Sequence, residues 1–182
     1  MEQLRGRVLV IGGARSGKSA YAESLLSTHR AVTYVATAPA RPDDSDWLAR
    51  IAAHKLRRPV SWATVETADL AGVLADAAPG DPPLLVESVT AWLTSVMDEA
   101  GSWGGDVAAE QKLASAVESL RSAWAGTKGP VVAVTDEVGQ GVVPETASGR
   151  LFRDELGALN QRLAADADTV WLVTAGLPQR LK

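Results

Sequence analysis

The chain has 182 residues, of which 46% are hydrophobic and 22% are charged, and its formal net charge is -4. This length and composition predict one globular domain over residues 1–182, and they exclude a disordered or fibrous chain. The negative balance argues against a nucleic-acid-binding protein, and no stretch reaches the roughly 20 apolar residues of a membrane span. Because the chain has no cysteine, disulfides and thiolate nucleophiles are excluded, and we expect a cytoplasmic protein.

Apolar runs typical of strands alternate with helical patterns along the chain. The first predicted strand, 7–11, ends at two glycines, and helical spacing follows over 18–26. Apolar residues at helical spacing predict amphipathic helices over 113–124 and 152–163. The other predicted strands are 32–37, 84–87, 131–135 and 169–174. Near-continuous apolar strands separated by helices predict an α/β fold, a parallel sheet with helices on both faces and functional groups at the carboxyl ends of its strands.

Two stretches, 39–46 and 101–106, are predicted as long loops, which in compact domains often form lids or binding sites. Among the six tryptophans, Trp124 and Trp171 fall on core periodicity, so we interpret them as packing residues. The remaining four lie in or near predicted loops, where one of them could contact a large ligand: Trp47, Trp62, Trp92 and Trp103.

A phosphate-binding loop is predicted between the first strand and the first helix. The string GGARSGKS matches the spacing G-x-x-x-x-G-K-[ST], and it lies in the strand–loop–helix context that this motif requires. Backbone N–H groups and the helix N-terminus would cradle phosphates, Lys18 would reach the β and γ phosphates, and Ser19 would ligate Mg²⁺. The alternative, a glycine turn that carries Lys and Ser by chance, is disfavoured by this context. The candidate nucleotide-binding residues are Gly12, Gly13, Ala14, Arg15, Ser16, Gly17, Lys18 and Ser19.

Two acids stand at predicted strand ends and are candidates for a second magnesium ligand. Glu87 follows the run 84–86, and Asp136 follows 131–135. Either carboxylate could hold the metal directly or through water, and either could instead be a helix cap or a loop residue. Only one of them is needed for the metal, and we expect Glu87 to hold it together with Ser19.

The two histidines have different surroundings. His29 follows the first predicted helix beside Arg30, and we interpret it as a solvated surface residue. His54 lies among Arg50, Lys55, Arg57 and Arg58, a basic cluster in an otherwise acidic chain. Such a cluster could bind an anion, and neutral imidazole could attack phosphorus to form a phosphoramidate. An ordinary basic surface explains the same residues, so the pattern itself leaves both interpretations open.

Taken together, six ordered blocks over nearly the whole chain resemble the bifunctional adenosylcobinamide kinase / adenosylcobinamide-phosphate guanylyltransferase family of cobalamin biosynthesis. The blocks are GGARSGKSAYAE, VTYVATA, RIAAHKLRRPVSWATVE, LLVESVTAWLT, VTDEVGQGVVPE and the stretch from Phe152 to the end. The resemblance implies a RecA-like P-loop sheet and a homotrimer. It also implies phosphorylation of adenosylcobinamide by ATP or GTP, followed by transfer of GMP from GTP through a guanylyl-histidine, which gives adenosylcobinamide-GDP.

In the pattern of the family that the chain resembles, the guanylylated histidine falls on His54, which favours the interpretation of His54 as a nucleophile. A carboxylate at Glu66 could accept hydrogen bonds from guanine N1–H and N2–H₂, a pairing that adenine cannot offer. The chain departs from some members at Ala53, where they have a second histidine, and at Asp136, where they often have Asn. The resemblance places further nucleotide-site positions on Thr37, Ala38, Pro39, Lys55, Leu56, Arg57, Arg58, Glu66 and Glu87.

Two other functions compete with this assignment. A P-loop kinase for another small molecule would explain the loop and Glu87 but would leave the block around His54 without a role. A non-enzymatic GTP switch would need a guanine-reading N-K-x-D motif, and no such string occurs in the sequence.

Overall fold

The computed structural model describes residues 6–38, 43 and 58–182. Within these ranges seven strands form one sheet in the order β3-β2-β4-β5-β1-β6-β7, and all neighbours are parallel except β6 and β7. The strands are β1 (Arg7–Gly12), β2 (Thr33–Ala36), β3 (Ala63–Glu66), β4 (Leu84–Glu87), β5 (Val131–Asp136), β6 (Thr169–Thr174) and β7 (Leu177–Arg180). The helices are α1 (Lys18–Leu25), α3 (Leu70–Asp76), α4 (Val89–Ala100), the 3-10 turn η1 (Ser102–Gly104), α5 (Val107–Gly126) and α6 (Ala147–Asp166).

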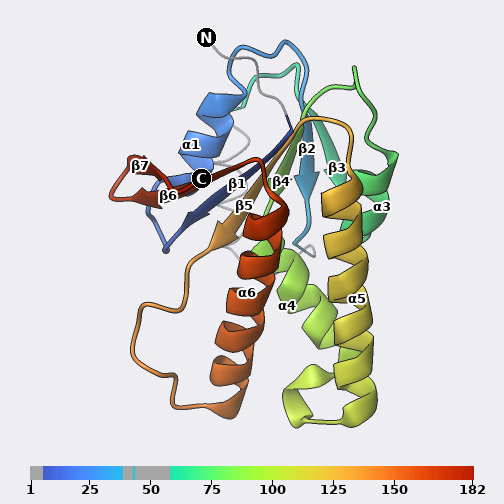
Figure 1. Cartoon of the computed structure of the whole chain (residues 1–182), viewed down its shortest axis with the longest axis vertical. Helices are drawn as coiled ribbons and strands as arrows, with labels where there is room; N and C mark the ends of the chain where they lie inside the picture. Colours follow the sequence, from blue (N-terminus) through green and yellow to red (C-terminus); the bar gives the residue numbers. More distant parts are fainter. Residues whose placement is uncertain (1–5, 39–42, 44–57) are drawn as a thin grey trace.

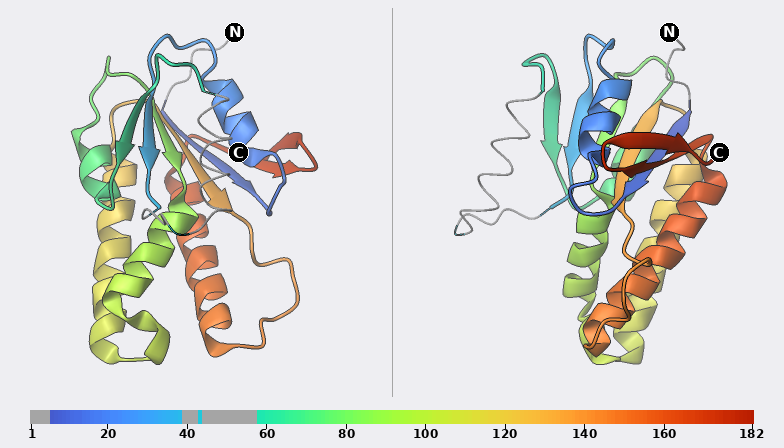
Figure 2. Two further views of the ribbon diagram at one scale, coloured as in Figure 1. Left: turned by 180° about the vertical axis from the view of Figure 1, so that it is seen from behind. Right: turned by 90° about the vertical axis from the view of Figure 1, so that its left-hand side faces the viewer.

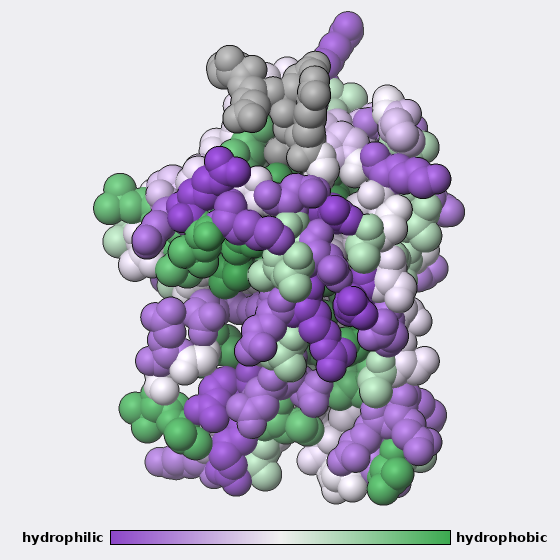
Figure 3. Space-filling view, in the orientation of Figure 1, coloured by the Kyte–Doolittle hydropathy of each residue, from purple (hydrophilic) through white to green (hydrophobic). Residues whose placement is uncertain are grey.

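Helices cover both faces of the sheet, as the sequence predicts (Figures 1 and 2). Successive residues of the central strands point to opposite faces, so Val8 and Val10 pack with α1 while Leu9 and Ile11 pack with α4 and α6. The central strands are buried along almost their whole length, which explains why their apolar runs do not alternate with polar residues. Hydrophilic side chains cover most of the face seen in Figure 3, and hydrophobic ones are confined to separate patches.

Two strands were not predicted, and both lie at the edges of the sheet. Every residue of β3 and β7 is exposed, so neither strand needs the apolar run by which buried strands are found. The strand β7 turns back on β6 through Ala175 and Gly176, which have φ angles of 52° and 80°. This two-residue turn in the left-handed region is the connection that joins tight antiparallel hairpins.

Other expectations need correction. Trp92 does not lie in a loop: it is buried in α4, and its Nε1 donates to the carbonyl oxygen of Ala68 at 3.2 Å. His29 is half-buried rather than solvated. The stretch 101–106 contains η1, with Gly101 and Gly105 in the left-handed region on either side. A loop that was not predicted, 137–146, joins β5 to α6 (Figure 1).

Several other features agree with the sequence. Trp124 is buried at 1% exposure, and its Nε1 donates to the carbonyl oxygen of Leu163. Trp171 packs its ring edge-to-face on Tyr21 with centroids 5.3 Å apart. Among the helices in the described ranges, none combines the length and the apolar character needed to cross a membrane.

Candidate active site

The strand β1 leads into a tight loop that ends at the first residue of α1. Gly12 closes the strand, and Gly17 precedes the helix with φ 92°, a conformation that favours glycine. A Cβ atom on Gly17 would lie 3.2 Å from the Cα atom of Gly176 in the β6–β7 turn. The amide of Gly176 also donates to the carbonyl oxygen of Ser16 at 2.7 Å, so the hairpin supports the loop from outside. This geometry belongs to a loop whose backbone wraps around an anion.

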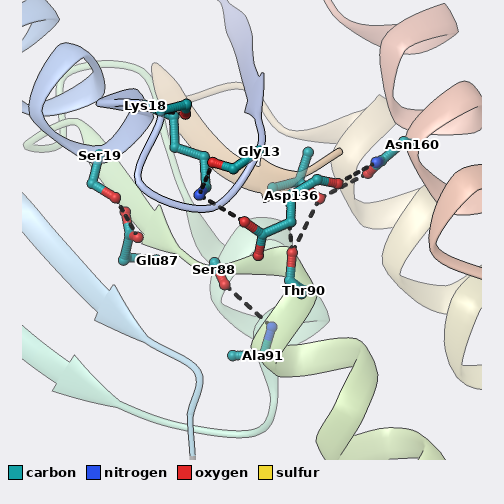
Figure 4. A network of polar contacts seen from close by, with 11 residues as sticks. Gly13, Lys18, Ser19, Glu87, Ser88, Thr90, Ala91, Asp136 and Asn160 are labelled. Atoms are coloured by element: carbon teal, nitrogen blue, oxygen red, sulfur yellow. Dashed lines mark hydrogen bonds and ion pairs between the residues drawn. The ribbon is translucent and has the colours of Figure 1, made fainter. Parts of the chain in front are cut away.

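The loop's lysine is held between two oxygens. Its Nζ donates to the carbonyl oxygen of Gly13 at 3.2 Å and lies 2.6 Å from Oδ1 of Asp136 (Figure 4). Gly12 and Asp136 are register partners in the adjacent strands β1 and β5, which explains why this carboxylate reaches Lys18. Both side chains are largely covered, with 12% of Lys18 and 28% of Asp136 exposed.

The loop's serine faces the other candidate acid. The Ser19 hydroxyl donates to Oε1 of Glu87 at 2.8 Å (Figure 4). Burial raises the pKa of Glu87 from 4.5 to about 7, although the Ser19 hydrogen bond and the Lys18 charge act in the opposite direction. The Ser19–Glu87 pair therefore offers two hard oxygen ligands in a place that disfavours an uncompensated carboxylate charge.

These two oxygens suit Mg²⁺, which is usually held by one or two side chains together with phosphate oxygens and water. In the described part of the chain, no group of three or more His, Asp or Glu side chains forms a metal site by itself. A cation at Ser19 and Glu87 would thus be completed by the nucleotide. Because Asp136 pairs with Lys18, the geometry favours Glu87 over Asp136 as the acidic metal ligand.

A buried polar network, which the sequence did not predict, fixes the backbone of Asp136. Asn160 of α6 accepts from the Thr135 hydroxyl at 2.8 Å and donates from Nδ2 to the Asp136 carbonyl oxygen at 3.0 Å. The Asp136 amide donates to Oγ1 of Thr90 at 2.8 Å. The available signal was a polar residue, Asn160, within the apolar stripe of α6 that includes Leu159.

The remaining predicted nucleotide residues are distributed around this edge of the sheet. Thr37 is buried, and its hydroxyl donates to the Ser88 carbonyl oxygen at 2.6 Å beside Glu87. Ala38 follows it along the chain. Glu66 is exposed at the end of β3, level with Ala36 of β2, which is in turn level with Glu87 of β4.

Glu66 and Glu87 therefore lie at the same edge of the sheet, and their backbones are two strand spacings, or roughly 10 Å, apart across the sheet. Arg58 lies with its guanidinium carbon 3.6 Å from the Tyr34 ring centroid. Five predicted site residues fall outside the described residues: Pro39, His54, Lys55, Leu56 and Arg57.

A P-loop that opens α1, and an acidic strand separated from β1 by the single strand β5, define a P-loop nucleotide-binding protein of the RecA-like type. Solved structures share this fold at low sequence identity. An ATPase of the type III secretion system of pathogenic bacteria matches with a TM-score of 0.58 and 14% identity, over 94% of this chain and 53% of that chain. The structure of PH0250 from Pyrococcus horikoshii OT3 matches with a TM-score of 0.54 and 6% identity, over 100% of this chain and 88% of that chain.

The chain belongs to the cobinamide kinase / cobinamide phosphate guanyltransferase family, whose family model matches residues 8–181. Bifunctional adenosylcobalamin biosynthesis proteins CobU from Escherichia coli K12 and Salmonella typhimurium LT2 are 40% and 41% identical to it, each over 96% of this chain and 99% of the relative. The protein CobP of Pseudomonas aeruginosa PAO1, with the same description, is 38% identical over 97% of each chain. The chain is therefore an enzyme with cobinamide kinase and cobinamide phosphate guanylyltransferase activities.

Proposed function

We propose that one nucleotide site, built on residues 12–19, serves both reactions of this enzyme. In the first reaction, a hydroxyl of adenosylcobinamide takes the γ-phosphoryl group of ATP or GTP. In the second, GTP guanylylates His54 with release of pyrophosphate, and the phosphate of adenosylcobinamide phosphate then displaces the histidine to give adenosylcobinamide-GDP. The observation that carries the proposal is the P-loop geometry, with Lys18 and the Ser19–Glu87 pair, in a chain that matches the family over residues 8–181.

For the kinase reaction, Lys18 exchanges its contact with Asp136 for the β and γ phosphates. Ser19 and Glu87 hold Mg²⁺, which when bound neutralises charge on the phosphate oxygens. The raised pKa of Glu87 supports this role, because a cation at Ser19 would compensate the charge of its buried carboxylate.

For the guanylyl transfer, the nucleophile is the neutral imidazole of His54, and the basic residues Lys55, Arg57 and Arg58 contact the guanylyl and pyrophosphate groups. Glu66 accepts from the guanine N1–H and N2–H₂ groups and so selects GTP over ATP in this step. Its place at the same sheet edge as Glu87 supports this assignment. Thr37, Ala38, Pro39 and Leu56 line the nucleotide.

The family match disfavours a P-loop kinase without guanylyltransferase activity. This alternative is tested directly because Lys18, Ser19 and Glu87 are parts of a phosphoryl-transfer site that are not specific to guanylyl transfer. We further expect the protein to be cytoplasmic and to form a homotrimer. Light scattering of the purified protein measures its oligomeric state. The sequence offers a direct way to separate the two candidates, since it has only two histidines, His29 and His54.

The deciding experiment incubates the protein with Mg²⁺ and GTP labelled at the α-phosphate and then denatures it. The bifunctional enzyme should retain acid-labile, base-stable label, as a phosphoramidate does. The label should disappear in His54→Ala and persist in the matched control His29→Ala. If the wild-type protein retains no label but still phosphorylates cobinamide, the chain is a kinase without guanylyltransferase activity.

A further inference from the structure

The hairpin formed by β6 and β7 lies beside α1 at the edge of the sheet (Figures 1 and 2), and it is held at both ends. Every residue of β7 is exposed, and Leu177 keeps 74% of its surface in solvent. Beyond β7, Lys182 donates from Nζ to the carbonyl oxygens of Ala164 and Ala165, the last turn of α6, at 3.2 and 2.8 Å. At the other end, the two-residue turn meets the P-loop. Burial of apolar surface does not explain the place of β7, and the P-loop contact supplies a functional reason for it.

The P-loop packs on this hairpin so closely that both glycines of its motif are needed for the fit. A Cβ atom on Gly12 would lie 2.6 Å from the carbonyl oxygen of Val173, its register partner in β6. A Cβ atom on Gly17 would lie 3.2 Å from the Cα atom of Gly176 in the turn. Because these neighbours are backbone atoms, they cannot swing aside as the end of a side chain can. The hairpin therefore forms one wall of the P-loop.

One hydrogen bond from the hairpin sets the direction of an amide in the P-loop. The Gly176 amide donates to the carbonyl oxygen of Ser16 at 2.7 Å. The peptide between Ser16 and Gly17 is trans, and in a trans peptide the C=O and N–H groups point in opposite directions. Since the Ser16 carbonyl group points at the hairpin, the Gly17 N–H group points away from it, into the loop. Backbone N–H groups of a P-loop bind phosphate oxygens, so this bond orients a group that contacts the nucleotide.

The turn that makes this hydrogen bond can be altered without touching the P-loop. Ala175 and Gly176 have φ angles of 52° and 80°, as in the type I′ turn, which favours Asn-Gly. A Cβ atom on Gly176 would meet no atom of the described residues within 4 Å. A side chain at this position would therefore act through the backbone conformation of the turn and not through a clash.

We propose that Gly176 is a positioning residue for nucleotide binding, and that the β6–β7 turn sets the P-loop backbone before the nucleotide arrives. It acts through the Ser16 carbonyl group and the Gly17 amide. Linkage makes the effect reciprocal, so bound nucleotide stabilises the hairpin by the same free energy. This inference rests on the proposed function, because it takes residues 12–19 to be the nucleotide site.

The test measures the Kd of GTP with Mg²⁺ by equilibrium titration of full-length variants. Gly176→Val puts a β-branched residue in the left-handed region, so we expect the turn to be disrupted and Kd to rise by at least about tenfold. The matched control is Gly80→Val, which introduces the same strain at φ 98° in the loop before β4, at the amino edge of the sheet and away from the P-loop. Its Kd should stay within about twofold of wild type. Ala175→Asn, which preserves the turn, should bind GTP at least as tightly as wild type.

Hydrogen exchange supplies a readout that a general loss of stability would not move. Saturating GTP should slow amide exchange in residues 171–182 of the wild-type protein, and Gly176→Val should lose this protection. The wild-type measurement needs no variant, so it decides even if Gly176→Val does not fold. Exchange in the wild-type hairpin that does not respond to GTP would overturn the inference.

The binding results separate the other failures. An unchanged Kd in Gly176→Val would overturn the positioning role. An equal rise in Gly80→Val would also overturn it, because loss of overall stability would then explain the effect. Lys18→Ala tests the proposed function separately: if it binds GTP as wild type does, the P-loop is not the nucleotide site, and the inference falls with it. Weak binding by Lys18→Ala beside normal binding by Gly176→Val would refute the positioning role alone.

Discussion

The carboxyl group of Glu87 should make the metal-free protein less stable as the pH rises, and Glu87→Gln should remove this effect. Burial raises its pKa from 4.5 to about 7 in the folded chain. Between these two values the unfolded chain has released the proton while the folded chain retains it. Since the folded state then binds more protons, the free energy of unfolding falls as the pH rises through this window and levels off above pH 7.

The size of the effect follows from the difference between the two pKa values. Each pKa unit corresponds to about 1.4 kcal/mol, so a difference of 2.5 units between 4.5 and about 7 gives at most about 3 kcal/mol. Glutamine has the same shape and its amide oxygen still accepts from the Ser19 hydroxyl, so the substitution removes the charge and little else. Relative to wild type, Glu87→Gln should therefore gain up to about 3 kcal/mol of stability between pH 4.5 and pH 8.

Urea unfolding in the presence of a metal chelator, at several pH values, measures this difference directly. Glu99→Gln, which replaces an exposed glutamate near the end of α4, serves as the control and should change stability by less than about 0.5 kcal/mol at every pH. A constant difference between Glu87→Gln and wild type across this range would refute the reasoning, because it would mean that the Glu87 carboxyl titrates alike in the folded and unfolded chains.

Three further predictions concern the P-loop, the core and the first strand. Gly17→Ala should weaken nucleotide binding, since φ 92° and the Gly176 Cα atom at 3.2 Å both oppose a side chain; unchanged affinity in a nucleotide titration would contradict this. Leu93→Ala should cost about 2–5 kcal/mol in urea unfolding, because Leu93 is fully buried, and a cost below 1 kcal/mol would count against this packing. Hydrogen bonds from Arg7 lower the pKa of Asp168, so Asp168→Asn should destabilise the chain at neutral pH; this loss should shrink as acid protonates the wild-type carboxylate, and a pH-independent loss would argue against the ion pair.

Much of the fold could be predicted from the sequence, because the central strands are buried on both faces. The runs at 84–87 and 169–174 match β4 and β6 at both ends, and β1 and β5 extend one residue beyond their predicted ends. The edge strands β3 and β7 are exposed and leave no such signal. Trp92 was wrongly predicted to lie in or near a loop for a related reason. The helix α4 begins directly after Ser88, and the burial of Trp92 depends on packing against elements far along the chain.

The candidate site shows the same division. The motif identifies Lys18 and Ser19, and the end of an apolar run identifies Glu87 and Asp136. The sequence alone favoured Glu87 as the metal ligand but left the role of Asp136 open. What separates them is the order of the strands, since β5 lies beside β1 and β4 lies one strand further away. This order brings Asp136 to Lys18 and leaves Glu87 for Ser19. Strand order is a tertiary property that local spacing does not contain.

The central claim, that one P-loop serves both reactions, is tested most directly by following cobinamide through them. Purified protein is incubated with Mg²⁺, GTP and cobinamide, and the corrinoid products are separated and identified by mass spectrometry. The account predicts cobinamide phosphate first and its GDP derivative later in wild type, neither product in Lys18→Ala, and only the phosphate in His54→Ala. Formation of the GDP derivative by Lys18→Ala at the wild-type rate from supplied cobinamide phosphate would contradict it, because guanylyl transfer would then not use the P-loop.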